Sequence, residues 1–374
     1  MIYFLGFLTL VFLVMAIVVI ARMQSVLKGV QTDTEQDAPV PNNKINGAMW
    51  IVFLVLGTIG SVWSYHAVKD GFLPEASSIH GRRTDELFWF SMSLMCIAAF
   101  LVNFLLFFFS WKYQYRKGYK ATFYADNHKL EIIWTAVPAV VMAILVVTGY
   151  SAWTDIMSDA PANAQVVEMM GKQFGWHARY GGSEDNKLGN YNYKLCDDNN
   201  QNPMGIDFSD EASFDDVMST AELHVIKDRP VSLKIRARDV LHSVFIPHMR
   251  VKMDAVPGMP TKFWFTPDKS TDEMRAELGN PKFDYEIACT EVCGRGHFSM
   301  RLRLIVEDEA SFKKWQSEQP TILANVLQTK PDYITRIPEN LRAKAMKYAP
   351  APAAADSTTA QTAGTATAAG ASFR

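Results

Sequence analysis

Hydrophobic positions gather in four long runs, all of which end before residue 154. Residues 1–21, 87–111 and 132–152 contain no charged side chain, and residues 45–68 contain only a histidine. A helix needs about 20 apolar residues to cross a bilayer, so each run is long enough to span one. The pattern therefore predicts four transmembrane helices. Tryptophans lie near the ends of the runs, as expected at a membrane interface: Trp50, Trp63, Trp89, Trp111, Trp134 and Trp153.

A secretory signal is the alternative interpretation of the first run. A signal begins with basic residues and has an apolar core of about 7–15 residues. Here the first basic residue, Arg22, follows the run, and the run is longer than such a core. These features favour a retained helix.

The basic residues between the runs predict how the helices are oriented. Residues 112–130 contain five lysines and arginines, whereas residues 22–47 contain three and residues 69–86 contain three against four acids. Loops rich in Lys and Arg stay on the cytoplasmic side. We therefore expect a multi-pass protein of a bacterial-type inner membrane, with both termini and the chain after residue 154 on the periplasmic side.

After about residue 163 the hydrophobic pattern changes to short stretches in which apolar and polar residues alternate. Gly, Pro, Asn and Asp separate these stretches, which is typical of a β-sandwich or barrel. A short amphipathic helix is expected at residues 310–318. The predicted strands include Gln165–Met170, Leu223–Ile226, Val231–Ile235, Thr261–Thr266 and Met300–Val306.

Two further segments interrupt or extend this pattern. Residues 181–222 contain ten acids against two lysines, and they are either a solvated loop or a surface that attracts a basic partner. Residues 321–374 form a C-terminal extension with a possible helix at Pro338–Tyr348. After about residue 350 the extension is rich in Ala, Thr and Ser, so we expect it to be disordered. The expected domains are 1–86, 87–154, 155–320 and 321–374.

Overall composition adds little beyond this division. The net charge is −2, which gives no general attraction for nucleic acid. Of the four cysteines, Cys96 lies in an apolar run and Cys196 stands alone in a polar segment, so neither indicates a disulfide framework.

The remaining cysteines belong to the segment CTEVCGRGHFSM, which places Cys289, Cys293, His297 and Met300 within twelve residues. One interpretation of this segment is a zinc site, because Cys and His bind zinc well. A thioether combined with thiolate and imidazole instead favours copper. A mononuclear blue copper site uses one Cys, whereas two thiolates can bridge two copper ions, each completed by a His and a weak axial ligand.

A dinuclear site needs a second histidine. His242, in RDVLHSVFIPHMRVKMDAVPG, is the better candidate because it lies where a strand is expected to meet a loop, and His248 remains the alternative. Met300 would complete one copper ion and the backbone carbonyl of Glu291 the other. The carboxylate of Glu291 would then be free to bind a different metal.

Four segments together resemble subunit II of cytochrome c oxidase, over roughly residues 87–316. They are LEIIWTAVPAVVMAIL, GKQFGWHARY and the two segments of the candidate copper site. The resemblance implies an all-β cupredoxin-like Greek-key domain on a transmembrane hairpin. It also implies that this chain receives electrons for a respiratory oxidase, while oxygen is reduced in another subunit.

The resemblance implies roles for particular residues. A dinuclear copper centre, CuA, would be held by His242, Cys289, Glu291 through its carbonyl, Cys293, His297 and Met300. The Glu291 carboxylate would reach a magnesium ion shared with subunit I. Electrons would pass from cytochrome c to CuA and then to a haem in subunit I. Glu131, which from the sequence alone is either an interfacial carboxylate or a proton-uptake group, would lie at the mouth of a proton channel.

The chain departs from the family pattern at the expected point where electrons arrive. The family commonly has a tryptophan after the Gln of the aromatic strand, but here Phe174 and Gly175 follow, with Trp176 retained. We therefore assign electron arrival to Phe174 and Trp176. The first two helices, the acidic insertion and the C-terminal extension exceed the usual plan, and they would serve a dedicated donor or a neighbouring complex.

Three other functions compete with this interpretation. A quinol oxidase subunit of the same fold lacks the copper ligands, and the copper domain of nitrous oxide reductase has no such membrane spans. A membrane-anchored copper carrier or sensor is the third alternative. It needs an exchangeable site, which two buried bridging thiolates would not provide.

Overall fold

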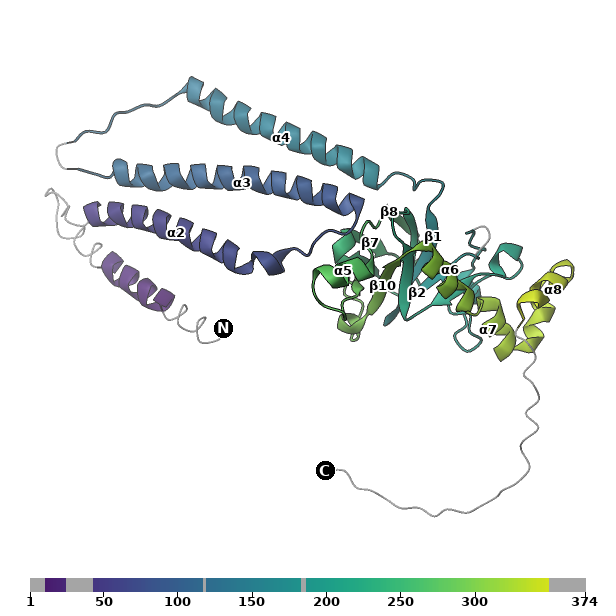
Figure 1. Ribbon diagram of the computed structural model, residues 1–374. Coiled ribbons are helices and arrows are strands. Elements are labelled where there is room, and N and C mark those ends of the chain that lie inside the picture. Colours follow the sequence, from purple (N-terminus) through teal and green to yellow (C-terminus); the bar gives the residue numbers. More distant parts are fainter. Residues whose placement is uncertain (1–10, 25–42, 117–118, 183–185, 350–374) are drawn as a thin grey trace, which may run out of the picture. The chain divides into compact units, whose positions relative to one another are not determined.

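Figure 1 shows the computed structural model, which describes residues 11–24, 43–116, 119–182 and 186–349. The chain divides into two compact units. One comprises Met1–Lys69 with Leu94–Glu131, and the other comprises Asp70–Ser93 with Ile132–Arg374. The segment after residue 350, which the sequence predicts to be disordered, lies outside the described residues.

Among the described residues, three helices are long and apolar enough to cross a membrane, and they confirm three of the four predicted spans. They are α2 (Asn43–Phe72), α3 (Ile79–Lys112) and α4 (His128–Ile156). The described part of the first run is helical at Val11–Gln24, which is too short to span a bilayer by itself. Its first ten residues lie outside the described part of the chain, so the fourth span stays a prediction.

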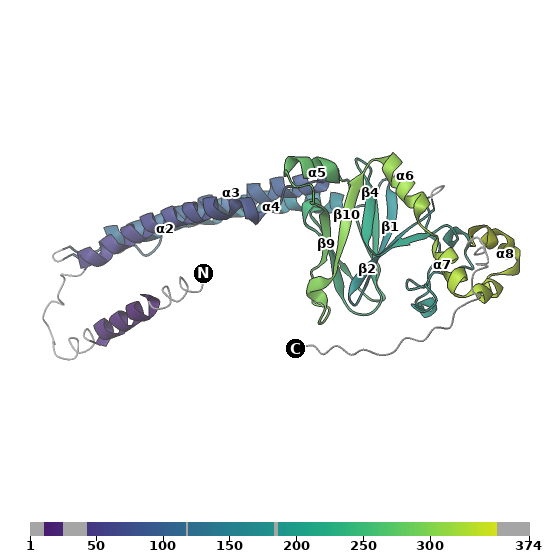
Figure 2. The same ribbon diagram turned by 60° about the horizontal axis from the view of Figure 1, so that its bottom comes forward.

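In the described part of the chain, ten strands form two five-stranded sheets. They confirm the predicted β-sandwich, whose strands can be followed in Figure 2. The first sheet has the order β3-β2-β1-β5-β8 and the second β4-β10-β9-β6-β7. Strands β1 and β5 pair in parallel, as do β4 and β10, and the other pairs are antiparallel. The bounds are β1 Gln165–Lys172, β2 Gly175–Tyr180, β3 Val217–Ser219, β4 Glu222–Ile226, β5 Val231–Ala237, β6 His242–Ile246, β7 Val251–Ala255, β8 Thr261–Phe265, β9 Tyr285–Cys289 and β10 Arg301–Glu307.

The core of the sandwich follows from the alternation of side chains along these strands. In β10, Leu302 and Leu304 are buried, whereas Arg301 and Arg303 on the opposite face are exposed. Successive side chains of a strand point to opposite faces, so one face of each sheet supplies the core. Cys289, Cys293 and Met300 belong to this same core, which places the candidate metal ligands at its edge.

A second, smaller core joins the acidic insertion to the C-terminal extension. Helix α6 (Glu309–Glu318) leads from β10 to α7 (Ile322–Thr329) and α8 (Glu339–Ala345). The interpretation of 181–222 as a solvated loop is wrong, because its apolar side chains are buried against these helices. The core comprises Met170, Met204, Ile206, Phe208, Phe214, Ile322, Leu323, Val326, Leu327, Ile337 and Ala345.

Many of the acids in the insertion are used inside this structure. Asp197, Asp207 and Asp210 accept hydrogen bonds from backbone N–H groups in their own turns. Asp198 pairs with Lys172 and Arg238, and Glu211 pairs with Lys344 of the extension. The acidic composition therefore has a structural explanation, and it need not indicate a surface for a basic partner.

A buried ionic network attaches the insertion to the first sheet. Arg179 donates to Glu168 at 2.8 Å and also to Asp216, and Arg236 donates to the other oxygen of Glu168 at 2.5 Å. All four side chains are at most 7% exposed. Two carboxylates and two guanidinium groups balance one another in charge, which is the condition for keeping charges away from water.

The connection between α2 and α3 docks on the second unit's β-sandwich. Ser77 N–H donates to the carbonyl of His248 at 2.7 Å, and Ile79 N–H donates to that of Thr266 at 3.0 Å. Arg250, which has a left-handed backbone with φ of 54°, makes a bidentate pair with Asp85 at 2.8 and 2.9 Å. This connection is therefore an integral part of the β domain.

We predict that Arg179→Leu destabilises the second unit by about 3–5 kcal/mol, because it leaves two buried carboxylates without their shared cation. Chemical denaturation of the full chain in detergent measures the change. Arg301→Leu is the matched control, since Arg301 is 63% exposed and its pair with Glu286 at 3.4 Å should contribute at most about 1 kcal/mol. Equal losses in the two variants would contradict the structural role given to the network.

Candidate metal centre

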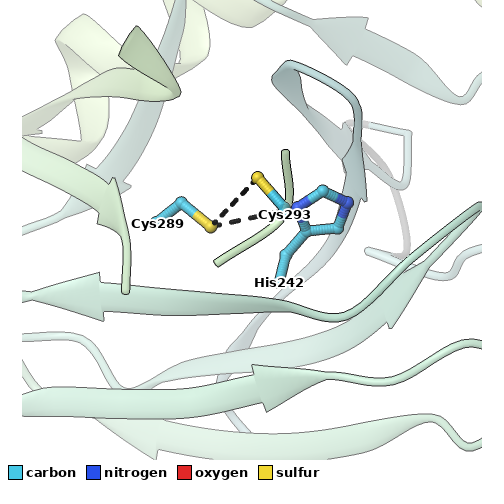
Figure 3. Close-up of side chains that lie close together, drawn as sticks. All are labelled: His242, Cys289 and Cys293. Carbon is cyan, nitrogen blue, oxygen red and sulfur yellow. Dashed lines mark hydrogen bonds between the residues drawn. The ribbon is translucent and has the colours of Figure 1, made fainter. Parts of the chain in front are cut away.

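Three potential metal ligands from two strands and a loop meet at one end of the sandwich (Figure 3). One ligand atom from each of His242, Cys289 and Cys293 lies within 4.8 Å of the other two, and all three residues are buried. His242 begins β6 and Cys289 ends β9. In the antiparallel pairing of these strands Cys289 lies opposite Val244, so His242, two residues earlier, shares its face.

The donors on the Cys289 side form one half of the site. The Sγ atom of Cys289 is 3.9 Å from Nδ1 of His242 and 4.0 Å from Sγ of Cys293. It also lies 3.3 Å from the backbone carbonyl oxygen of Glu291. An imidazole nitrogen and a carbonyl oxygen thus approach the same thiol.

The donors on the Cys293 side form the other half. The Sγ atom of Cys293 is 3.6 Å from Nδ1 of His297 and 3.9 Å from Sδ of Met300. The structure therefore brings together all six predicted donors. The two thiols lie in the middle, and each has two of the other four donors near it.

His248, the alternative second histidine, lies elsewhere. It belongs to the short 3-10 helix η3 (Pro247–Met249) between β6 and β7, and its ring packs edge-on against Phe283 and Tyr285 at 5.3 Å. Among the described residues the cluster contains His242 and not His248. The geometry therefore favours His242.

The chemistry of the donors fits copper. Both cysteines are free thiols, and the set combines two thiols, a thioether and two imidazoles, which are soft and borderline donors. Burial, followed by the neighbouring Cys289, raises the pKa of Cys293 to about 11. A thiol must lose its proton to bind a metal, so a cation placed between these sulfurs would supply the missing stabilisation of the thiolates.

Asp239 fixes the orientation of the His242 imidazole. Its carboxylate accepts backbone hydrogen bonds from Gln173 and Val240 at 2.8 Å, and it lies 2.9 Å from Nε2 of His242. Burial would raise the pKa of Asp239, but these hydrogen bonds outweigh burial and lower it. An ionised Asp239 accepts a hydrogen bond from Nε2–H, which leaves the lone pair of Nδ1 directed towards the thiol.

Gln173 connects the two halves of the site. Its backbone N–H is held by Asp239, and its side-chain Nε2 donates to the carbonyl of Cys293 at 2.6 Å. Gly171 leaves room for the ring of His242, because a Cβ added there would lie 2.8 Å from its Cδ2 atom. The ligand segments do not reveal these roles by themselves, although an aspartate three positions before a candidate ligand is a visible signal.

The two aromatic residues expected to receive electrons differ in exposure. Trp176 is 1% exposed, and its ring centroid lies 5.9 Å from that of His242. Phe174 is 42% exposed and covers the ligand loop, since a Cβ added to Gly296 would lie 2.5 Å from the Phe174 ring. The exposed ring therefore contacts the loop that carries Cys293 and His297, and the buried ring contacts His242.

The structure also places the two remaining predicted site residues. Glu131 lies in the first turn of α4, and its carboxylate is 3.6 Å from Nδ1 of His128. The carboxylate of Glu291 makes no hydrogen bond or ion pair with any described residue. Its carbonyl, by contrast, points towards Cys289.

A buried cluster of soft donors at the end of a β-sandwich, on a chain with long apolar helices, defines a membrane-anchored protein with a copper-binding cupredoxin-type domain. Two family models match the chain. The transmembrane domain of cytochrome c oxidase subunit II matches residues 66–151, and the periplasmic domain of the same subunit matches residues 165–307. Together they match more than half of the chain, which belongs to the cytochrome c oxidase subunit II family.

Individual relatives agree with this family. An alternative cytochrome c oxidase subunit 2 from Bradyrhizobium diazoefficiens is 29% identical over 280 residues, covering 72% of this chain and 91% of the relative. A cytochrome c oxidase subunit 2 from a Synechocystis species is 24% identical over 314 residues, covering 79% and 90%. The solved periplasmic domain of a cytochrome oxidase subunit II from Bradyrhizobium japonicum is 21% identical, covers 42% of this chain and 94% of that chain, and has a TM-score of 0.28.

The family confirms the main inference from the sequence. The chain is a subunit of a haem–copper oxidase, an oxidoreductase, and works with other oxidase subunits. Its apolar helices form the membrane part, and its β-sandwich is the periplasmic part.

We predict that Asp239→Asn weakens copper binding about 10–100-fold, because the imidazole of His242 loses the charge that fixes its orientation. Titration of the apoprotein with copper against a competing chelator measures the affinity. Asp254→Asn, an exposed aspartate on the neighbouring strand β7, is the control and should bind copper normally. Unchanged affinity in Asp239→Asn would contradict the role given to this carboxylate.

Proposed function

We propose that this chain is the electron-receiving subunit of a respiratory oxidase and that its metal centre is a dinuclear CuA site. The observation that carries the proposal is the arrangement of four donors around two thiols. His242 and the Glu291 carbonyl lie near Cys289, and His297 and Met300 lie near Cys293. The proposed ligands are His242, Cys289, Glu291, Cys293, His297 and Met300.

When bound, the copper pair supplies a site that gains and loses one electron. The protein's part is to hold the donors still, so that little rearrangement accompanies each transfer. Adjacent strands β6 and β9 fix His242 and Cys289. Gln173 and Asp239 then hold the Cys293 carbonyl and the His242 ring through one continuous set of hydrogen bonds.

Cytochrome c, or a cytochrome c domain of a neighbouring complex, is the proposed donor. Phe174 is the exposed aromatic ring over the ligand loop, so a donor haem would approach the site there. Trp176 is buried against His242 and gives a second aromatic contact to the ligands. Electrons would continue to a haem in subunit I, where oxygen is reduced to water.

A magnesium ion shared with subunit I is the proposed partner of the Glu291 carboxylate. The carbonyl of Glu291 faces Cys289, and its carboxylate has no partner among the described residues. Because copper would use only the carbonyl, Glu291→Gln should weaken binding of a divalent cation to the oxidase while leaving the copper spectrum unchanged. Manganese, which replaces magnesium at oxygen sites, reports the binding by its magnetic resonance. Loss of the copper spectrum in this variant would contradict the division of roles.

For the membrane part we propose four spans, with residues 112–130 in the cytoplasm and both termini in the periplasm. Glu131 would then lie at the cytoplasmic end of α4, where a carboxylate can take up protons. Slower proton uptake by an oxidase carrying Glu131→Gln would support this role, and unchanged uptake would leave Glu131 as an interfacial carboxylate.

A copper carrier or sensor is the competing function. The thiols of Cys289 and Cys293 are only 8% and 4% exposed, which favours a retained metal over an exchangeable one. Rapid transfer of copper from the loaded chain to a chelator would favour the carrier.

We predict that the copper-loaded full chain is purple and gives the multi-line copper resonance of a mixed-valence pair. Cys293→Ser should abolish this signal, because one bridging thiolate is lost. Cys196→Ser is the matched control, since Cys196 is also a free thiol but lies in the insertion. His248→Gln should also retain the signal. A colourless zinc-bound chain, or loss of the signal in His248→Gln, would overturn the proposed ligand set.

A further inference from the structure

A cavity lies on the outer face of the first sheet, and none of the proposed copper ligands is among its lining residues. Its volume is about 520 Å³, within the range of about 300–1,000 Å³ that is typical of small-molecule sites. Its lining includes Lys234 of β5, Lys262 of β8 and Met253 of β7. Met157, which follows α4, and Tyr191 of the acidic insertion complete its walls.

The position of Met157 sets the depth of this cavity relative to a membrane. Ile156 ends α4 and packs against the core of the sandwich, so the helix end and the sheet are held together. Trp153, 59% exposed, has the character of an interfacial residue. Met157 is four residues further, about 6 Å along a helix, and the headgroup layer is about 5–8 Å thick on each side. Met157 therefore places this side of the cavity near the level of the lipid headgroups.

The charges of the cavity favour an anion. Antiparallel pairing of β5 and β8 places Lys234 opposite Lys262, and both side chains are exposed. Among the described residues Lys234 has no ion pair, and Lys262 pairs only with Asp159, which is itself 90% exposed. The third cation, Arg236, is already used by Glu168 and by the Tyr191 ring, whose centroid lies 4.0 Å from its guanidinium carbon. Lys234 thus remains for a ligand, and an anion would compete with the exposed carboxylate of Asp159 for Lys262.

We propose that this cavity binds the headgroup of an anionic phospholipid from the periplasmic leaflet. Lys234 and Lys262 would hold the phosphate. Met157, Met253 and Pro260 would contact the glycerol and the first part of an acyl chain. Tyr191 gives the acidic insertion a direct part in the site. The proposal does not depend on the nature of the metal centre.

The test uses the oxidase containing the full chain, reconstituted in nanodiscs with a photoactivatable phosphatidylglycerol. We expect cross-links to the peptides around Met157 and Lys262. Each lysine near a membrane surface contributes about 1 kcal/mol, so Lys234→Gln and Lys262→Gln should each lower the cross-linking yield about fivefold. Lys314→Gln, an exposed lysine on α6 away from the cavity, is the matched control and should leave the yield unchanged.

Three outcomes would overturn the proposal. Cross-linking that is unaffected in both variants, or equally reduced in Lys314→Gln, would show that these lysines form no specific site. Absence of cross-links in the assembled oxidase would show that the cavity does not bind the lipid there. Efficient competition by inorganic phosphate, with none by excess short-chain phosphatidylglycerol, would identify a site for the free anion. The copper spectrum of each variant checks that the domain has folded.

Discussion

The pairing of β6 with β9 is the constraint on which the rest of the site depends. It brings His242 within 3.9 Å of Cys289, although the two residues are 47 positions apart in the sequence. The segment Cys289–Met300 supplies the other donors, but it leaves one half of the site without an imidazole. A sheet register shifted by one residue would turn His242 to the opposite face. The metal centre is therefore a product of the sandwich core, and the burial that stabilises this core also keeps water from the thiols.

The ligand residues could be predicted from the sequence because soft donors at short spacing are rare and chemically specific. The strands could be predicted where apolar and polar residues alternate, as at Arg301–Glu307. The supporting hydrogen bonds could not be predicted in this way. Gln173 and Asp239 approach each other only when β1, β5 and the ligand loop converge in the folded domain. The second core could not be predicted from local sequence patterns either. Phe208 and Phe214 lie among turn-forming acids, and their partners in α7 lie more than 100 residues later in the chain. An acidic composition suggested exposure, whereas folding uses many of those carboxylates as turn acceptors or ion-pair partners.

The acidic insertion is joined to the β domain by polar contacts as well as by apolar ones. Arg179 and Arg236 carry two buried positive charges beneath the insertion. Burial removes water from these charges, and ion pairs with Glu168 and Asp216 offset that loss. Such a network tolerates few alternative positions of the insertion, because any shift would separate buried opposite charges. Tyr191 is held in the same way by its contact with Arg236. The wall that the insertion gives to the outer cavity is therefore fixed by the sheet itself.

The hairpin of β6 and β7 links the metal centre to the connection between α2 and α3. His242 begins the hairpin at the metal site. At its other end, the carbonyls of His248 and Met249 accept hydrogen bonds from Ser77 and Ser78, and Arg250 holds Asp85. A backbone N–H, a hydroxyl and a bidentate ion pair together restrain this turn more than any one of them alone. Because β6 is a short, hydrogen-bonded strand, a restraint at its end is transmitted to the position of His242. The connection between the first two described spans thus contributes to the rigidity that an electron-transfer site requires.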